Sequence, residues 1–302
     1  MLQAGAAVAG ASFGLSGYAV AEPRQLAVRR YRIAPPNWPD GLELKIALVA
    51  DLHVCEPWMN VARVQRIVER TNALKPDCTL LLGDYLPGKR LLRFARTIPA
   101  QGWAQALGQL RAPLGVHAVL GNHDWTDDAG AQARGQGPTG ARLALEAAGI
   151  PVYENDAVRL QKGGRPFWIA GLGDQGALIR WHPVYGWVAY GVHDLPSTMA
   201  KITDDAPVIL MAHEPDIFPR VPDRVALTVS GHTHGGQVRV PGMRRFMPSQ
   251  YGNRYRYGHV VESGRNLLVS GGLGCSAVPV RFGMPPEIVI VELGHWSAAV
   301  QS

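Results

Sequence analysis

The chain has 302 residues, of which 47% are hydrophobic and 18% are charged, a composition that excludes an intrinsically disordered protein. Its 30 Lys and Arg exceed its 24 Asp and Glu, and the net charge of +6 is explained equally well by solubility or by an anionic partner, either a phosphorylated substrate or an anionic membrane surface. The scattered cysteines, Cys55, Cys78 and Cys275, exclude a disulfide framework and a zinc ribbon.

Residues 1–21 contain no charged side chain and are rich in Ala and Gly. The Ala-Val-Ala sequence at 19–21 matches the pattern at which a secretory signal is cleaved, although the basic residues that normally precede such a signal are missing. The arginines between residues 24 and 32 follow the apolar run, as in an anchor that faces the cytoplasm. We therefore predict a signal-like or anchor segment over 1–21, a Pro- and Arg-rich linker over 22–41 and a folded domain over 42–302.

Apolar runs in the folded domain alternate with amphipathic stretches, a pattern typical of α/β proteins. The first unit comprises an apolar run at 44–50, apolar side chains at helical spacing over 60–74 and a second apolar run at 78–82. A strand, a helix and a strand in this order imply that the two strands are parallel. Further strands are expected at 115–120, 208–212, 226–229, 267–270 and 287–293.

Other parts of the domain show weaker patterns. We expect residues 91–110 to be helical in part, the Gly-rich residues 127–140 to form a loop and residues 141–148 to form a short helix. Residues 181–190 are rich in Trp and Tyr, and two interpretations are open: a hairpin that packs on the core, or an aromatic lid beside a functional site. The basic and aromatic segment 239–256 is either a solvated loop or a cradle for a second phosphate or an anionic headgroup.

Polar side chains follow five of the apolar runs, close to the point where each predicted strand ends. Each motif alone has an ordinary explanation as a turn or a surface histidine, but together they lie at the carboxyl edge of a sheet, where open α/β sheets bind ligands. The residues are Asp51, His53, Asp84, Asn122, His123, Asp124, His213, His232 and His234. Because side chains two apart on an extended segment point the same way, we expect His232 and His234 to lie together.

Such groups are ligands for divalent metal ions. Carboxylate, imidazole and amide-oxygen donors without thiolates suit Mn, Fe, Zn, Co, Ni or Mg. The candidates outnumber the ligands that one ion needs, so two ions that share a bridging carboxylate fit better. Such a pair would lower the pKa of a shared water and hold the oxygens of a phosphoryl group.

The motifs resemble a known family. Asp51-x-His53, Gly83-Asp84, Gly121-Asn122-His123-Asp124, His213 and Gly231-His232-x-His234 resemble the five-block signature of the calcineurin-like metallophosphoesterases. Finer motifs resemble a bacterial exported or membrane-associated branch that includes phosphodiesterases and relatives that cleave the pyrophosphate of UDP-2,3-diacylglucosamine. These motifs are His213-Glu214-Pro215-Asp216, the Gly-Gly-Gln that follows His234, and Arg281-Phe282-Gly283 with Pro285-Pro286-Glu287.

The resemblance implies an α/β fold, a two-sheet sandwich with flanking helices and a site at the strand ends. It implies two sets of ligands for divalent ions, in which Asp84 bridges. The first ion would be held by Asp51, His53, Asp84 and His234, and the second would be completed by Asn122, His213 and His232.

The resemblance also implies roles for two residues that bind no metal. His123 would orient the phosphate or protonate the leaving oxygen, and Asp124 would hold the ring of His123 in place. A non-catalytic scaffold would be free to lose metal ligands or His123, and this chain has lost none of them. We therefore expect an enzyme.

The expected activity is hydrolysis of a phosphodiester or pyrophosphate in a lipid-linked or nucleotide-type substrate. A phosphomonoesterase is the alternative, and a scaffold with the same fold is the least favoured one. We expect a monomer without a nucleic-acid-binding module, since no helix-turn-helix or zinc-finger pattern occurs. It would be exported to the bacterial periplasm or cell envelope or associated with a membrane, or else lie on the cytoplasmic face of the inner membrane.

Overall fold

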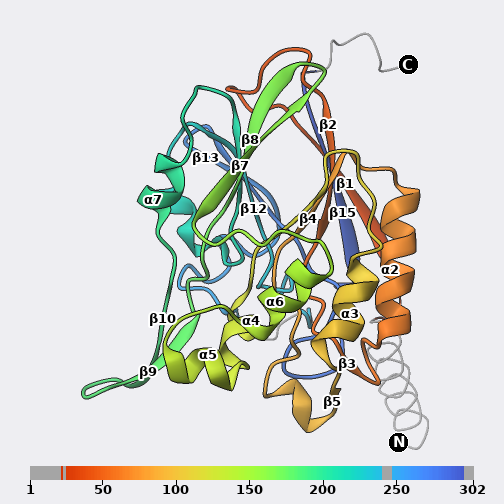
Figure 1. Cartoon of the computed structure of the whole chain (residues 1–302), viewed down its shortest axis with the longest axis vertical. Coiled ribbons are helices and arrows are strands. Elements are labelled where there is room, and N and C mark those ends of the chain that lie inside the picture. Colours follow the sequence, from red (N-terminus) through yellow and green to blue (C-terminus); the bar gives the residue numbers. More distant parts are fainter. Residues whose placement is uncertain (1–21, 23–24, 240–246, 296–302) are drawn as a thin grey trace, which may run out of the picture.

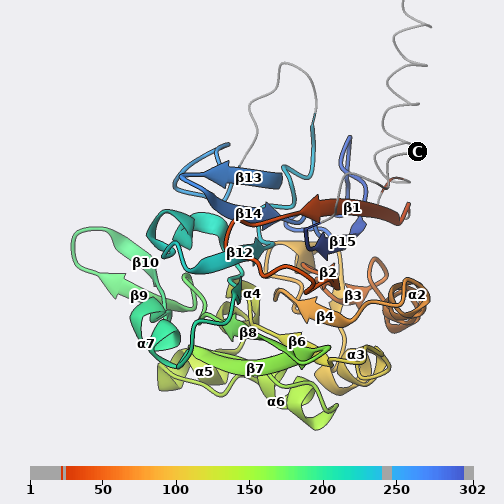
Figure 2. The same ribbon diagram turned by 90° about the horizontal axis from the view of Figure 1, so that it is seen from above.

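Two β-sheets packed face to face form the centre of the computed structural model (Figure 1). The structure describes residues 22, 25–239 and 247–295, so the signal-like or anchor segment predicted over 1–21 lies outside the described residues. Side chains from both sheets fill the space between them, and helices cover the outer faces (Figure 2). The predicted two-sheet α/β sandwich with flanking helices is therefore confirmed.

The first sheet has the strand order β1-β15-β2-β4-β6. Its strands are β1 (Ala27–Ile33), β2 (Leu44–Val49), β4 (Cys78–Leu81), β6 (Val116–Ala118) and β15 (Glu287–Leu293). Neighbouring strands are parallel except for β15 and β2, which are antiparallel. The predicted strand–helix–strand unit corresponds to β2, α2 (Val61–Ala73) and β4, and its two strands are parallel as expected.

The prediction of a linker over 22–41 is wrong, because part of this segment is the edge strand β1. Three arginines of this segment, Arg29, Arg30 and Arg32, lie on the strand. Arg29 comes within 3.8 Å of Glu287, and Arg32 donates to Glu292 at 2.9 Å. An edge strand tolerates such charged side chains because part of its surface faces water. The folded domain therefore includes residues before position 42.

The second sheet has the strand order β13-β14-β12-β11-β8-β7. Its strands are β7 (Asp156–Lys162), β8 (Arg165–Gly171), β11 (Val208–Met211), β12 (Val225–Ser230), β13 (Gly258–Glu262) and β14 (Arg265–Val269). The inner strands are parallel, and antiparallel strands close both edges. Strands β4, β11 and β12 are buried along their whole length, which explains why their sequences are continuous apolar runs.

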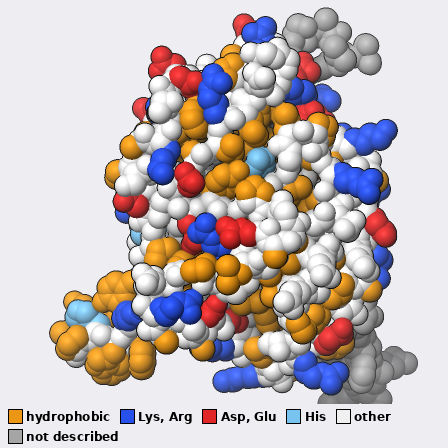
Figure 3. Space-filling model, viewed as in Figure 1, with side chains coloured by type: hydrophobic (Ala, Val, Ile, Leu, Met, Phe, Trp, Pro, Cys, Tyr) orange, Lys and Arg blue, Asp and Glu red, His pale blue; other side chains and the backbone are white. Residues whose placement is uncertain are grey.

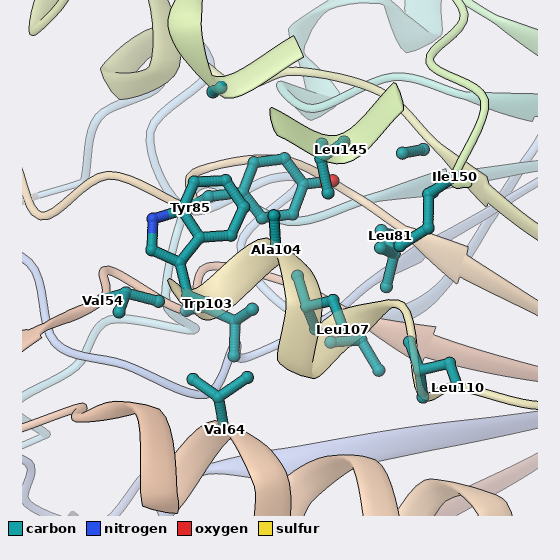
Figure 4. Close-up of a cluster of buried hydrophobic side chains, with 14 of the residues drawn as sticks. Val54, Val64, Leu81, Tyr85, Trp103, Ala104, Leu107, Leu110, Leu145 and Ile150 are labelled. Carbon is teal, nitrogen blue, oxygen red and sulfur yellow. The ribbon is translucent and has the colours of Figure 1, made fainter. Parts of the chain in front are cut away.

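Helices α2, α3 (Ala100–Leu107) and α6 (Gly140–Ala147) cover the outer face of the first sheet (Figure 1). Figure 4 shows Val64 of α2, Trp103 of α3 and Leu145 of α6 in one cluster with Leu81 of β4. The ring of Tyr85, which follows β4, stacks on Trp103 with ring centroids 5.3 Å apart. This cluster fixes the position of the chain directly after β4, where Asp84 lies.

The outer face of the second sheet packs against α7 (Leu195–Ala200) and the 3₁₀-helix η3 (Pro215–Arg220). The smaller elements are β3 (Cys55–Glu56), η2 (Leu91–Arg93), β5 (Arg96–Thr97) and α4 (Asn122–Thr126). None of the helices in the described part of the chain is both long enough and apolar enough to cross a membrane.

The prediction of a loop over 127–140 is wrong in its middle, where the chain forms α5 (Ala129–Arg134). Asp128 caps this helix by accepting from the N–H of Ala131 at 2.8 Å, and Gly135 ends it with a left-handed φ of 74°. A helix of this length has too few turns to show helical periodicity in a Gly-rich sequence.

The aromatic stretch forms a hairpin of β9 (Leu178–His182) and β10 (Gly186–Tyr190) that projects from the body of the molecule (Figure 1). A hairpin was one of the two predicted forms, but its expected packing on the core is wrong. Trp181 is 63% exposed and Trp187 is 71% exposed. These rings contact each other across the two strands instead of the core, with centroids 5.7 Å apart.

Candidate metal centre

Strands of both sheets deliver the candidate residues to one place. Strand β2 is followed by Asp51 and His53, β4 by Asp84, β11 by His213 and β12 by His232 and His234, while Asn122 and His123 begin α4. Strands β2 and β4 belong to the first sheet, and β11 and β12 belong to the second. The site therefore forms where the carboxyl edges of the two sheets meet.

The side chains form three overlapping groups, in each of which the possible ligand atoms lie within 4.8 Å of one another. The groups are Asp51 with His53 and His234, Asp84 with His213 and His232, and Asp84 with His53 and His123. Asp84 Oδ2 lies 3.3 Å from His213 Nε2 and 3.7 Å from His53 Nε2. Asp84 therefore stands between the first two groups, where a bridging carboxylate would have to be.

The expectation that His232 and His234 lie together is wrong. Both residues have left-handed backbone angles, with φ of 68° and 51°, so the chain turns instead of staying extended. His232 joins the group of Asp84, whereas His234 lies in the group of Asp51, with His234 Nε2 at 3.7 Å from Asp51 Oδ1. One short motif therefore contributes an imidazole to each of the two groups.

Several buried atoms of the site have no hydrogen-bond partner among the described residues. They include Asp51 Oδ2, Asn122 Oδ1 and His213 Nε2. An unsatisfied buried polar atom costs about 1–3 kcal/mol, so three of them in one place need a partner. Carboxylate, amide-oxygen and imidazole-nitrogen donors without thiolates fit hard or borderline divalent metal ions.

Backbone carbonyls orient the histidine rings. The Nδ1 atoms of His53 and His213 lie 3.0 Å and 2.6 Å from the carbonyl oxygens of Leu86 and Leu82, which leaves Nε2 of both rings toward the site. His232 is turned the other way, because its Nε2 lies 2.8 Å from the carbonyl oxygen of Pro248. Hydrogen bonds of this kind fix the tautomer and orientation of metal-binding histidines.

Glycines and strained backbone angles allow the close approach of the loops. A Cβ on Gly121 would lie 2.7 Å from His213 Cε1, and a Cβ on Gly231 would lie 2.5 Å from Asp51 Oδ2. Left-handed backbone angles occur at Asp51, His53, Asp84, His232 and His234. Such angles are costly for residues with a Cβ and concentrate at functional sites, so their occurrence at five candidate ligands supports a functional role for this edge.

Burial and neighbouring charges perturb the pKa values of the candidate ligands. Burial raises the pKa of Asp51 to about 7, although the charge of His213 opposes it. Burial also raises the pKa of Asp84, but the charges of His213 and His123 outweigh it, so that this pKa lies well below its usual range. Burial lowers the pKa of His53 to about 4, which leaves its imidazole neutral and able to bind a metal at neutral pH.

The expectation that Asp124 holds the ring of His123 is wrong. Both carboxylate oxygens of Asp124 accept from backbone N–H groups, those of Asp84, Tyr85, Leu86 and Gly121. Asp124 therefore fixes the loop that carries Asp84. The carboxylate nearest to the ring of His123 is Asp127, at 4.0 Å from Nδ1.

The surroundings of His123 favour its protonated form. Burial lowers the pKa of His123, but the carboxylates of Asp84 and Asp127 outweigh it and raise the pKa above its ordinary value. The backbone N–H of His123 donates to Asp84 Oδ1 at 2.9 Å, which ties the start of α4 to the loop after β4. The structure thus places a proton-carrying side chain beside the two groups of candidate ligands.

Sequence reasoning missed two residues of the site. Asp127 lies one helical turn after His123, a spacing that could have identified it. Arg281 is fully buried, and its guanidinium lies 3.1 Å from His234 Nδ1 while it donates to the carbonyls of Gly271 and Gly274. The motif that contains Arg281 does not reveal this contact, because Arg281 and His234 lie 47 residues apart in the chain.

A cavity of about 600 Å³ opens at the candidate ligands. Its floor includes Asp84, Asn122, His123, His232 and His234, and the exposed cations Lys89 and Arg90 lie on its wall. The rest of the lining combines polar side chains, among them Asp127 and Gln237, with the apolar residues Leu91, Ile179, Val238, Pro248, Ala277 and Val278. The cavity can therefore hold an anionic group at the ligands and a bulky apolar group beside it.

Much of the basic and aromatic segment 239–256 supports the fold, although residues 240–246 lie outside the described residues. Arg254 donates to Glu262 at 2.7 Å, and the ring of Tyr255 is fully buried. Val238 and Pro248, on either side of residues 240–246, line the cavity.

A family model supports the same conclusion as the geometry. The model described as calcineurin-like phosphoesterase matches residues 44–236, more than half of the chain. The chain belongs to this family. It is a metal-dependent phosphoesterase, and the matched region contains all of the candidate ligands.

Individual relatives of this phosphoesterase cover most of its length. It is 28% identical over 295 residues to the uncharacterized metallophosphoesterase YkuE of Bacillus subtilis, covering 97% of this chain and 93% of that protein. It is also 28% identical over 296 residues to the phosphodiesterase YaeI of Escherichia coli, covering 97% of both. A zebrafish (Danio rerio) transmembrane protein with metallophosphoesterase domain is 28% identical over 265 residues, covering 84% of this chain and 54% of that protein.

Proposed function

We propose that this phosphoesterase binds two divalent metal ions and hydrolyses phosphodiester bonds. The observation that carries the proposal is the position of Asp84 between two groups of donors, each with further imidazole ligands. Asp51, His53, Asp84 and His234 would hold the first ion, and Asp84, Asn122, His213 and His232 would hold the second. When bound, such a pair supplies an activated water and neutralises charge on the phosphoryl oxygens.

The chain's own residues would complete the reaction. The water oxygen bonds to phosphorus while the bond from phosphorus to the leaving oxygen breaks. His123, which lies beside the carboxylate of Asp127, gives its proton to the leaving oxygen and then takes up the proton that the attacking water loses. The products are a phosphomonoester and an alcohol. Asp127, whose carboxylate lies 4.0 Å from His123 Nδ1, favours the protonated ring, and Asp124 holds the loop that carries Asp84.

The shape of the cavity favours a diester over a monoester. A monoester needs room for one organic group, whereas the cavity of about 600 Å³ extends from the ligands along an apolar wall and past two exposed cations. The similarity to the protein named phosphodiesterase YaeI over nearly the whole chain supports the same choice. A pyrophosphate linkage, which also carries substituents on both sides, is the second candidate, because Lys89 and Arg90 suit its additional negative charge.

We further propose that the enzyme is exported or membrane-associated. The uncharged segment 1–21 and the basic residues that follow it support this location. A relative named as a transmembrane protein with metallophosphoesterase domain supports it as well.

Hydrolysis by metal-reconstituted protein tests the proposed activity. The purified chain is treated with a chelator, reloaded separately with Mn, Fe, Zn, Co, Ni or Mg, and assayed with bis-p-nitrophenyl phosphate and with p-nitrophenyl phosphate. We expect turnover of the diester that disappears with the chelator and returns with metal, together with two equivalents of metal by elemental analysis. Turnover of the monoester alone, or one equivalent of metal at full activity, would refute the proposal.

A further inference from the structure

The hairpin of β9 and β10 carries an unusual set of exposed side chains. Val184 and Tyr185, at its turn, are each 76% exposed, and the paired rings of Trp181 and Trp187 are exposed beside them. Figure 3 shows this region as a hydrophobic protrusion at one side of the molecule. Large apolar side chains gathered on an exposed projection mark an interaction surface.

The hairpin itself carries no acidic side chain. Residues 178–190 contain no Asp or Glu, and Arg180 lies at the base of the hairpin against Gly135. Arg134, at the end of α5, is exposed next to this base. The chain as a whole carries a net charge of +6. Exposed Trp and Tyr side chains next to Arg180 and Arg134 are complementary to the interface of a bilayer with anionic headgroups.

The hairpin is connected directly to the cavity at the metal centre. Ile179, the second residue of β9, lines this cavity, and β9 lies against α4, which carries Asn122 and His123. Ile179 continues the apolar wall that Val238 and Val278 form, and these two side chains are 38% and 40% exposed. The hairpin therefore contributes an apolar side chain, Ile179, to the cavity that holds the candidate ligands.

We infer that the hairpin inserts into the interface of an anionic bilayer and that the cavity takes a phosphodiester with a lipid tail from that bilayer. This inference rests on the proposed function, because it names the substrate class of the same site. The phosphate would lie at the metal ligands, and the tail would lie along Ile179, Val238 and Val278. A protein partner or a second copy of the chain is less favoured, because the hairpin offers aromatic rings and cations without an acidic group.

Vesicle binding by the full chain tests the role of the hairpin independently of catalysis. The wild type is compared with the double variant Trp181→Ser and Trp187→Ser and with a control, Leu143→Ser and Val261→Ser. The control residues are 54% and 58% exposed and lie outside the hairpin. The vesicles contain either equal parts of phosphatidylglycerol and phosphatidylcholine or phosphatidylcholine alone, and circular dichroism checks that each variant is folded.

We expect the wild type to co-sediment with the anionic vesicles at low salt and less at high salt. The hairpin variant should bind about tenfold or more weakly, since it loses two interfacial Trp side chains, while the control binds like the wild type. Equal binding of all three proteins, which would assign any membrane contact to other residues, would overturn the inference. A shift from dimer to monomer in the hairpin variant without lipid would overturn it too, by assigning the hairpin to a second copy.

Turnover of two diesters, one embedded in vesicles and one soluble, distinguishes failure of this inference from failure of the proposed function. The p-nitrophenyl ester of phosphatidic acid, embedded in the anionic vesicles, is compared with soluble bis-p-nitrophenyl phosphate. We expect the hairpin variant to lose about tenfold on the embedded diester, in parallel with its binding. Its turnover of the soluble diester should stay at the wild-type value. Failure of the wild type on both diesters would refute the proposed function but leave the vesicle-binding result intact, whereas turnover of the soluble diester alone would refute the lipid substrate.

Discussion

Replacement of His123 by Ala tests whether this imidazole gives a proton to the leaving oxygen. The variant keeps the backbone N–H that bonds Asp84 Oδ1 at 2.9 Å. It also removes no atom from the group of Asp84, His213 and His232 or from the group of Asp51, His53 and His234. We therefore expect the variant to bind the same amount of metal as the wild type.

The size of the effect depends on the leaving group. A positioned general acid contributes about 10²–10⁴ in rate. The side chain of His123 is 25% exposed, so water can reach the leaving oxygen and replace the imidazole in part. We expect a loss of about 10²-fold in kcat for a diester that releases an alcohol, or about 2.7 kcal/mol of activation free energy. For a diester that releases p-nitrophenolate, which needs no proton to leave, we expect less than about tenfold.

The assay measures kcat for both diesters and metal content by elemental analysis. His259→Ala is the matched control, because this exposed histidine bonds Asn266 in the second sheet and does not line the cavity. An equal loss on both diesters would contradict proton donation and leave His123 as a group that orients the phosphate. Loss of metal from the variant would show instead that His123 is a ligand.

Further predictions concern the metal ligands and their supports. Asp84→Asn should lose most of its bound metal and most of its turnover together, because a neutral amide cannot replace the charged carboxylate that bridges two ions. Elemental analysis and a rate measurement on the same sample check this prediction. Full activity with two ions bound would contradict the assignment. Arg281→Lys should weaken metal affinity about 10–100-fold, since Lys cannot reproduce the contacts of the guanidinium with His234 and with the backbone carbonyls of Gly271, Gly274 and Met284. Competition with a chelator measures that affinity, and an unchanged value would show that Arg281 supports the fold alone. In metal-free protein, Asp51→Asn should gain stability relative to the wild type as the pH rises from about 4 to about 7. The pKa of Asp51 is raised to about 7 in the folded wild type, so between about pH 4 and pH 7 the native state holds a proton that the unfolded state has lost. The stability that the wild type has at low pH is therefore lost as the pH rises through about 7, whereas Asn at position 51 does not titrate. Urea unfolding with a chelator at several pH values measures the difference, which should not depend on pH if Asp51 ionises normally.

The sequence by itself determined the class of fold and the residues brought to the metal centre. Strands buried on both faces need continuous apolar runs, so β4, β11 and β12 were visible as such. The polar residues that follow these runs, among them Asp84 and His213, were identified because ligand sites lie at the carboxyl ends of such strands. Both signals are local: each depends on a few adjacent residues.

Only the tertiary structure decided how these local pieces combine. Strand β1 exists because it pairs with β15, about 260 residues later, and no pattern in its own Arg-rich sequence reveals that partner. The turn after β12 places His232 and His234 in different groups, a division that the family resemblance implied but that the expected extended backbone did not. Asp124 accepts from the backbone of the loop after β4, and the carboxylate beside the ring of His123 is that of Asp127. This arrangement also depends on the folded positions of the loops. Each outcome depends on contacts between segments far apart in the chain, and such contacts exist only once the two sheets have packed.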